Sequence, residues 1–431
     1  MSLQSDFKTF VLNISNLDFE DIDTKYKGIT TKLNSHYYDL DSETDNSKKV
    51  GSIGRRTAIK GISDLDMLFE IPDERFNDFK NYESNGPSQL LQEVKNILLE
   101  KYSRTDIKGD GQVVVVDFDS QHIEVVPCHK IYEYTYEYPD THDGGKWRTT
   151  SPDLDIQKIK ETNNTFPILI PLCMMTRAWK NHSGVNLSGI LIDILAYKFV
   201  TENFYKVADY KNNYFQLVLD FFMFLTDLDD NEENYYTPGS GERIEKKSKI
   251  HKKAKKAYQK LLKMKEDDSY HLRDIFGNEF PKSQVLLEDS YKSFFKSFSF
   301  RNTEQFIEDL YPVNIKYDLD IEGRVYQDGF RPELLSVLKI LRHRKKIEFF
   351  INSTSVPKPY RIFWKVRNVG YQAEKRDCIR GQIVESKFET KTEPISFDGP
   401  HFVECYIIKD GVCVARDRVD VPIKLDSYSV Y

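Results

Sequence analysis

The stretch GSIGRRTAIKGISDLDMLFEI, residues 51–71, joins a glycine-punctuated turn to a short run in which acidic and apolar residues alternate. Successive side chains of a strand point to opposite faces, so the alternation predicts that Asp64 and Asp66 share one face. Two carboxylates on one strand face suit a hard cation such as Mg²⁺. The turn at Gly51 and Ser52 offers backbone N–H groups and a hydroxyl to phosphate oxygens. The stretch therefore predicts a metal-assisted phosphate site beside a strand.

A third carboxylate is expected on a neighbouring strand. The β-branched runs at residues 112–117 and 122–126 are separated by a short polar link, which predicts a hairpin. Glu124 lies between apolar neighbours in the second run and is expected to project beside the aspartate pair. Asp117 and Asp119, on the other arm, are alternatives. An acid-apolar-acid triplet alone is better explained by solvated acids flanking a buried Leu, so the site depends on the triplet and the Gly-Ser turn together.

Three segments of different character follow one another along the chain. Residues 1–165 mix helices with strands, residues 166–300 have the periodicity of long helices, and residues 301–431 contain mostly short strand-like runs. We expect an α+β fold from this order. The longer expected helices cover residues 88–102, 169–182, 187–204, 214–228 and 243–265, with a further one at 333–342 inside the last segment.

Composition narrows the class of protein. The chain has 431 residues, 39% of them hydrophobic, and a formal net charge of −6, so any nucleic-acid site must be a local patch. Five cysteines without CxxC spacing argue against a disulfide framework or a zinc knuckle, and they fit a reducing cytoplasm. No signal peptide and no apolar run long enough for a bilayer is evident, so we expect no membrane partner.

The order of Gly-Ser turn, acid-apolar-acid and later apolar-acid-apolar strand resembles the polymerase-beta-like nucleotidyltransferases. Within that superfamily the stretch looks like the cGAS/DncV-like enzymes, whose bacterial members make second messengers for anti-phage defence. The segments KWRTTSPD (146–153) and MTRAWKNHSGVNLSGILIDIL (175–195) resemble later parts of these enzymes. The last stretches, FWKVRNVGYQAEKRDCIRGQI (363–383) and HFVECYIIKDGVCVARDRVDVPI (401–423), are similar to a C-terminal sensor domain found in some members and in related cyclases.

This resemblance implies a fold, an activity and a set of site residues. The fold would be a polymerase-beta-like mixed sheet in a palm-like catalytic domain (1–165), a helical nucleotide-binding domain (166–300) and a β-rich sensor-like domain (301–431). The activity would be the Mg²⁺-dependent joining of ATP and GTP, with two ions and Mn²⁺ as an alternative, into a cyclic dinucleotide such as cyclic GMP-AMP. The catalytic and metal-binding residues would be Asp64, Asp66 and Glu124. The nucleotide-binding residues would be Gly51, Ser52, Arg177, Lys180 and Ser188.

Two departures from the family pattern and two other functions stay open. Glu124 stands where Asp is usual, and Gly189 follows Ser188 where some relatives have an aromatic residue that stacks on the base. Ring closure leaves no motif, so a linear oligonucleotide synthase like the oligoadenylate synthases is an alternative. An inactive nucleotidyltransferase fold that binds RNA is another.

A lysine-rich stretch near residue 250 predicts an amphipathic helix with a cationic face. Lysines along one helix can contact successive phosphates without reading bases, although a solvated face explains the same charges. Animal relatives respond to double-stranded nucleic acid, so we expect a structured or double-stranded RNA activator. We also expect the enzyme to be a monomer. The residues expected to bind RNA are Lys249, Lys252, Lys253, Lys256 and Lys260.

Overall fold

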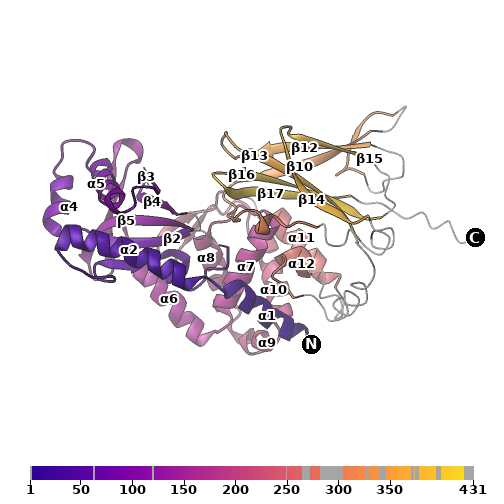
Figure 1. Ribbon diagram of the computed structural model, residues 1–431. Coiled ribbons are helices and arrows are strands. Elements are labelled where there is room, and N and C mark those ends of the chain that lie inside the picture. Colours follow the sequence, from indigo (N-terminus) through magenta and orange to yellow (C-terminus); the bar gives the residue numbers. More distant parts are fainter. Residues whose placement is uncertain are drawn as a thin grey trace, which may run out of the picture. The chain divides into compact units, whose positions relative to one another are not determined.

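The computed structural model describes residues 2–61, 64–118, 121–248, 250–264, 272–281, 304–326, 330–338, 346–369, 373, 378–394 and 399–421. The chain divides into two compact units, each described here by itself (Figure 1). The N-terminal unit comprises residues 7–177 and 188–246. The C-terminal unit comprises residues 1–6, 178–187 and 247–431.

The N-terminal unit contains a mixed sheet and most of the helices. Its helices, of which the first and the seventh also give residues to the other unit, are α1 (Leu3–Ser15), α2 (Phe19–Tyr38), α3 (Gly51–Gly54), α4 (Asp73–Lys80), α5 (Gly86–Lys101), α6 (Pro152–Thr165), α7 (Leu169–Ser183), α8 (Gly189–Glu202), α9 (Val207–Asn212) and α10 (Tyr214–Asp227). Its strands are β1 (Ser47–Lys49), β2 (Asp64–Glu70), β3 (Asp106–Asp110), β4 (Val113–Phe118), β5 (Gln121–Tyr132), β6 (Thr135–Asp140), β7 (Lys146–Thr150), β8 (Asn234–Tyr236) and β9 (Arg243–Glu245).

Seven strands form the main sheet, in the order β1-β2-β5-β4-β3, with β6 pairing with β5 and β7. The central pair, β2 and β5, is parallel, and the other pairs are antiparallel. The expected hairpin is therefore present as β4 and β5, and the expected acid-bearing strand as β2. This mixed sheet with its helices confirms the α+β fold.

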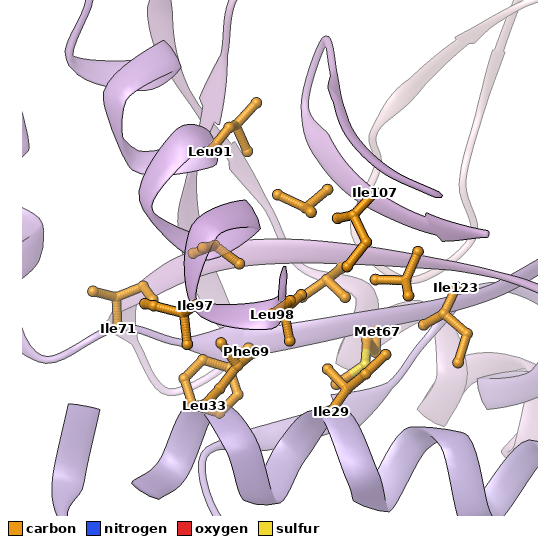
Figure 2. Close-up of a cluster of buried hydrophobic side chains, with 14 of the residues drawn as sticks. Ile29, Leu33, Met67, Phe69, Ile71, Leu91, Ile97, Leu98, Ile107 and Ile123 are labelled. Atoms are coloured by element: carbon orange, nitrogen blue, oxygen red, sulfur yellow. The ribbon is translucent and has the colours of Figure 1, made fainter. Parts of the chain in front are cut away.

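Helices α2, α4 and α5 cover one face of this sheet, where they bury a single hydrophobic core (Figure 2). Met67 and Phe69 of β2 are fully buried in it, together with Leu33 of α2 and Leu98 of α5. Because side chains alternate along a strand, burying this apolar face turns the acidic residues of β2 to the opposite face. The core thus decides where the carboxylates point.

The ends of several helices are fixed by local hydrogen bonds. The Asp18 carboxylate accepts a hydrogen bond from the Asp21 N–H at the start of α2, and Asn213 caps α10 in the same way. Pro87 occupies the first turn of α5, where no intrahelical N–H is needed. These local hydrogen bonds and the proline fix where the helices begin. The helix ends expected from periodicity for α5 and α10 lie within a few residues of the observed ends.

The C-terminal unit is rich in strands. Its helices include α11 (His251–Leu262) and α12 (Arg273–Phe276). Its strands are β10 (Leu319–Tyr326), β11 (Glu333–Leu334), β12 (Lys346–Thr354), β13 (Arg361–Asn368), β14 (Arg380–Ser386), β15 (Thr390–Pro394), β16 (His401–Lys409) and β17 (Val412–Val421). They form two antiparallel sheets in the orders β11-β10-β12-β15 and β14-β13-β16-β17. Side chains of both sheets share one core, including Phe349 and Trp364, as in a β-sandwich.

Two expected helices differ from the structure. In the region 243–265, a short strand, β9, precedes the helix α11, which begins at His251. In the region 333–342, the described part begins with strand β11, which pairs with β10, so the prediction of a helix there is wrong for residues 333–338. The expected division into three domains at residues 165 and 300 stays a prediction. The two compact units consist of alternating stretches of the chain and do not test it.

All five cysteines are free thiols. Burial raises the pKa of Cys128, Cys173 and Cys405 well above the usual value, and it raises the pKa of Cys413 to about 12. Cys378 is only partly buried. Within the described ranges, no helix is both long and apolar enough to cross a lipid bilayer.

Candidate active site

The strand register brings the three predicted acids to one face of the N-terminal sheet. In the parallel pair of β2 and β5, Asp64 lies opposite His122 and Asp66 lies opposite Glu124. Neighbouring strands are about 4.8 Å apart, and residues two apart share a face. The three carboxylates therefore project from adjacent strands on the face opposite the core, and each is partly accessible.

Gly51 holds the turn against one of these acids. Its φ is +60°, and a Cβ built on it would lie 1.7 Å from Oδ2 of Asp66, so no other residue fits without displacing that carboxylate. A backbone hydrogen bond also joins the turn to the strand, since the Val50 N–H donates to the Asp66 carbonyl at 2.9 Å. The turn and the acidic strand are thus one structural feature.

Ser52 follows in the short helix α3 and anchors the next loop. Its carbonyl accepts hydrogen bonds from the N–H groups of Thr57 and Ala58, at 2.9 and 3.2 Å. The Ser52 hydroxyl has no hydrogen-bond partner among the residues that the structure describes. It is available to an oxygen of an incoming phosphate.

Of the two alternative acids, Asp117 shares the same face but has a partner there. It lies opposite His122 in the antiparallel pair of β4 and β5, and its Oδ1 is 2.5 Å from Nδ1 of that histidine. Asp119 lies outside the described residues. The register places Glu124 directly beside Asp66, and its role as the third acid stays a prediction.

Carboxylate oxygens are the donors that Mg²⁺ and Mn²⁺ prefer, so the residues of this face fit a divalent ion by their chemistry. In the part of the chain that the structure describes, no group of three or more His, Cys, Asp or Glu side chains is gathered closely enough to hold an ion. The fit consequently rests on the shared face and the donor type.

Arg177, expected at the nucleotide, is part of a buried ion network. Its guanidinium contacts Asp193 at 2.6 and 2.9 Å and donates to the Gly189 carbonyl at 2.8 Å. Asp193 also receives the Arg55 guanidinium at 2.8 Å and the Thr57 hydroxyl at 3.0 Å. Although burial opposes ionisation, Arg177 and Arg55 hold the pKa of Asp193 below its usual value.

This network joins three parts of the N-terminal unit: the loop after Ser52, the helix α7 and the start of α8. Sequence patterns did not reveal it, because Asp193 occurs within an apolar helix, GILIDIL, without any motif. A single acid in an otherwise apolar run was the signal, since a buried carboxylate requires a cationic partner.

The remaining two predicted nucleotide residues lie on helices α7 and α8. Ser188 caps α8, where its hydroxyl accepts a hydrogen bond from the Leu191 N–H at 3.3 Å, and the residue is exposed. Lys180 is nearly buried, in the part of α7 that belongs to the C-terminal unit. Their contact with a nucleotide stays a prediction.

The predicted RNA-binding lysines of α11 point in two directions. Lys253 forms an ion pair with Asp417, and Lys256 with Asp420 at 2.8 Å, both on β17 of the same unit. Lys252 is 90% exposed, and Lys260 is half-buried. Lys249 lies outside the described residues.

The N-terminal and C-terminal parts of the chain each match the model of a known domain family. Residues 1–163 match the model of the Second Messenger Oligonucleotide or Dinucleotide Synthetase domain. Residues 301–424 match the model of the Adenylyl/Guanylyl and SMODS C-terminal sensor domain. No curated protein matches the chain.

Several solved structures resemble the chain at low identity. CdnC of Escherichia coli MS115-1, solved with ATP, is 14% identical with a TM-score of 0.49, over 65% of this chain and 99% of that one. The DncV cyclic AMP-GMP synthase of Vibrio cholerae is 13% identical with a TM-score of 0.45, over 65% and 88%. A STING-associated CdnE c-di-GMP synthase from Capnocytophaga granulosa is 19% identical with a TM-score of 0.43, over 58% and 85%.

Proposed function

Because this chain is a cGAS/DncV-like nucleotidyltransferase with a C-terminal sensor domain, we propose that it joins ATP and GTP into a cyclic dinucleotide such as cyclic GMP-AMP. We further propose that it acts in antiviral defence, as a monomer in the cytoplasm, where its five free cysteines stay reduced. The observation that carries the proposal is the single sheet face with Asp64, Asp66 and Glu124, on which Asp66 lies against Gly51.

Asp64, Asp66 and Glu124 are the residues that would hold divalent ions. Two bound Mg²⁺ ions, or Mn²⁺ in their place, would supply charge stabilisation for the attacking and leaving oxygens of a displacement at phosphorus. The longer side chain of Glu124 carries its carboxylate one methylene further from its strand than an Asp would.

The residues around these acids orient the triphosphate. Gly51 lets the turn lie directly against the Asp66 carboxylate, and the Ser52 hydroxyl donates to a phosphate oxygen. Lys180 and Ser188 would steady the remaining phosphates. With the donor held in line, an acceptor hydroxyl attacks the α-phosphorus, a new phosphodiester bond forms, and pyrophosphate leaves. The free hydroxyl of the linear product then attacks the α-phosphorus of that product's own 5′-triphosphate, a second pyrophosphate leaves, and the ring closes.

Replacing both aspartates of β2 tests this assignment. We expect Asp64→Asn with Asp66→Asn to lower pyrophosphate release and product formation by more than about 100-fold, because amides replace the anionic metal ligands. The fold should be retained, since both residues are partly exposed and lie outside the core. The measurement uses all four labelled triphosphates with Mg²⁺, and circular dichroism monitors the fold.

The matched control is Asp143→Asn in the same unit, because this side chain is 84% exposed and away from β2. It should keep full activity. Phosphatase treatment separates a cyclic dinucleotide, which has no terminal phosphate, from a linear oligoadenylate, and linkage-specific nucleases identify the linkage. Wild-type turnover in the double variant would remove the catalytic assignment of Asp64 and Asp66. Absence of product with the wild-type chain would instead favour the alternative of an inactive nucleotidyltransferase fold that binds RNA.

We also propose that structured RNA activates the enzyme through the outer lysines of α11. Lys252 and its neighbour Lys255 are exposed, whereas Lys253 and Lys256 are engaged by β17. Each lysine that contacts a phosphate releases counterions, which makes binding sensitive to salt.

We expect Lys252→Glu with Lys255→Glu to weaken binding of a double-stranded RNA and to reduce the slope of log affinity against log salt by about one per lost contact. Fluorescence anisotropy at several salt concentrations measures both quantities. The control, Lys358→Glu with Lys387→Glu, carries the same charge change on exposed lysines elsewhere in the C-terminal unit. Equal losses in the two variants would mean that α11 has no special part in RNA binding.

A further inference from the structure

A cavity inside the C-terminal unit is surrounded by basic side chains. It lies among the end of α7, the helices α11 and α12, and the strands β16 and β17, and it has a volume of about 50 Å³. A water molecule needs roughly 10–15 Å³ measured in the same way, so the cavity has room for a few waters or for one small polyatomic ion. The cavity is lined by three carboxylates, Asp274, Glu404 and Asp417, and by six basic residues, His182, Lys253, Lys256, Lys260, Arg416 and Arg418.

Carboxylates on the same unit balance four of these cations. Lys253 and Lys256 pair with Asp417 and Asp420 of β17. The two arginines also have partners: Arg416 contacts Glu308 at 2.7 Å and Glu404 at 3.2 Å, and Arg418 contacts Asp420 at 2.8 Å and Asp274 at 3.4 Å.

Lys260 is the exception. Among the residues that the structure describes, its ammonium group has no hydrogen bond and no ion pair, although the side chain is half-buried. Burial and the neighbouring Arg418 lower the pKa of Lys260 below its usual value, although the carboxylates of Asp274 and Asp420 act in the opposite direction. A partly buried cation without a partner is costly, and an anion in the cavity would remove that cost.

Arg418 is held in position for such an anion. Its guanidinium carbon lies 3.6 Å from the centre of the Phe402 ring, so the planar group is stacked. Nε and Nη1 donate to Asp420 and Asp274, whereas Nη2 has no partner in the described part of the chain. One donor of a fixed guanidinium therefore remains unused beside Lys260.

We propose that this cavity binds a single phosphate group, held mainly by the Lys260 ammonium and the free Nη2 of Arg418. The small volume accepts a phosphate but not a base or a ribose, so the ligand is inorganic phosphate or a phosphomonoester whose remainder stays outside. Arg418 lies within residues 301–424, which match the sensor-domain model, and Lys260 lies outside that match. The cavity belongs to the C-terminal unit and is distinct from the acid-bearing sheet face of the N-terminal unit.

Isothermal titration calorimetry tests the proposal. The full-length chain is titrated with inorganic phosphate in EDTA at constant ionic strength. We expect one phosphate per chain, at least tenfold weaker binding for Lys260→Gln, and retained binding for Lys260→Arg, which keeps the charge and the cavity. Lys255→Gln, an exposed lysine on the same helix, is the matched control and should bind phosphate like the wild-type chain. Circular dichroism confirms that each variant is folded.

Two further arms identify the source and the place of binding. A parallel titration with AMP separates the two ligand sources, because tighter binding of AMP that still requires Lys260 indicates a phosphomonoester, and equal binding indicates free phosphate. The double variant Asp64→Asn with Asp66→Asn should bind phosphate normally, since the cavity belongs to the other unit.

Three results would overturn the proposal. The first is no phosphate binding by the wild-type chain up to about 10 mM, a concentration well above the roughly 1 mM dissociation constant that corresponds to 4.1 kcal/mol. The second is an equal loss in Lys260→Gln and Lys255→Gln, which would show general charge screening. The third is a requirement for Lys260 in binding of double-stranded RNA but not of phosphate.

Discussion

Gly51 is the residue on which the geometry of the acid-bearing face depends most directly. Its φ of +60° and the 1.7 Å that would separate an added Cβ from Asp66 Oδ2 leave room for hydrogen only. We expect Gly51→Ala to lower product formation at least tenfold, because the methyl group displaces the Asp66 carboxylate. The left-handed backbone should also cost about 1–2 kcal/mol of unfolding free energy. Product assays and urea denaturation measure the two effects.

Gly144→Ala separates the two causes. This residue also has a positive φ, +88°, but a Cβ there meets nothing within 4 Å. The control should therefore lose a similar amount of stability and keep its activity. If both variants lose the same fraction of activity, backbone strain alone explains the effect, and the contact with Asp66 is unimportant.

At the scale of single residues, the sequence predicted which side chains share a face but not who their neighbours are. The period of two along β2 suffices to place Asp64 with Asp66. The position of Glu124 opposite Asp66 depends on a parallel pairing between strands more than fifty residues apart, which no local pattern encodes. The contact between Asp117 and His122 lies within the predicted hairpin, but it depends on the register of β4 against β5, which the sequence did not indicate.

Among the elements, α3, α7 and α8 are joined by the buried network around Asp193. We expect Arg177→Met to lower the unfolding free energy by about 3 kcal/mol, because it leaves a carboxylate that is only 1% exposed with Arg55 as its remaining cation. Urea denaturation monitored by circular dichroism measures the change.

Two comparisons sharpen the Arg177→Met experiment. Lys206→Met breaks a pair with Asp220 in which the lysine is 39% exposed, and it should cost less than about 1 kcal/mol. Adding Asp193→Leu to Arg177→Met removes the stranded charge and should recover part of the loss. A loss below about 1 kcal/mol for Arg177→Met alone would contradict the structural role of the network.

The elements also show where sequence patterns reach their limit. Periodicity correctly predicted the amphipathic helix α11, but it could not indicate that acids on β17 would engage Lys253 and Lys256. A helix was wrongly predicted at residues 333–338, because the local helix preference is overridden by the pairing of Glu333 and Leu334 with β10. Asp417 and Asp420 are distant from α11 in sequence, whereas β10 is the strand directly before β11. In both cases a contact with another element, and not the local pattern, decides the outcome.

Across the whole molecule, acid should act first on the C-terminal unit. Burial, together with Arg416, lowers the pKa of His182 from 6.5 to about 4, and burial also lowers the pKa of His401. At a pH between the unfolded and folded pKa values of His182, the unfolded chain binds more protons than the folded chain. The unfolding free energy therefore decreases as the pH falls from 6.5 toward about 4. The buried Glu404, whose pKa Lys365 and Arg416 lower despite burial, adds a loss in the same direction at lower pH.

We therefore expect the urea midpoint of the C-terminal unit to fall between pH 7.5 and pH 5, and His182→Gln to reduce this fall. The sign follows from a folded pKa that lies below the unfolded one. Denaturation curves of both proteins at the two pH values provide the measurement. An equal pH dependence in the variant would assign the effect to other groups.

The four buried thiols allow such a loss of structure to be located. A protonated, inaccessible sulfhydryl reacts slowly with a maleimide, so labelling of the folded chain should be confined to Cys378. Cys128 and Cys173 lie in one unit, and Cys405 and Cys413 in the other. Mass spectrometry of the modified peptides would thus report, without any added dye or engineered tag, which half of the protein opens first.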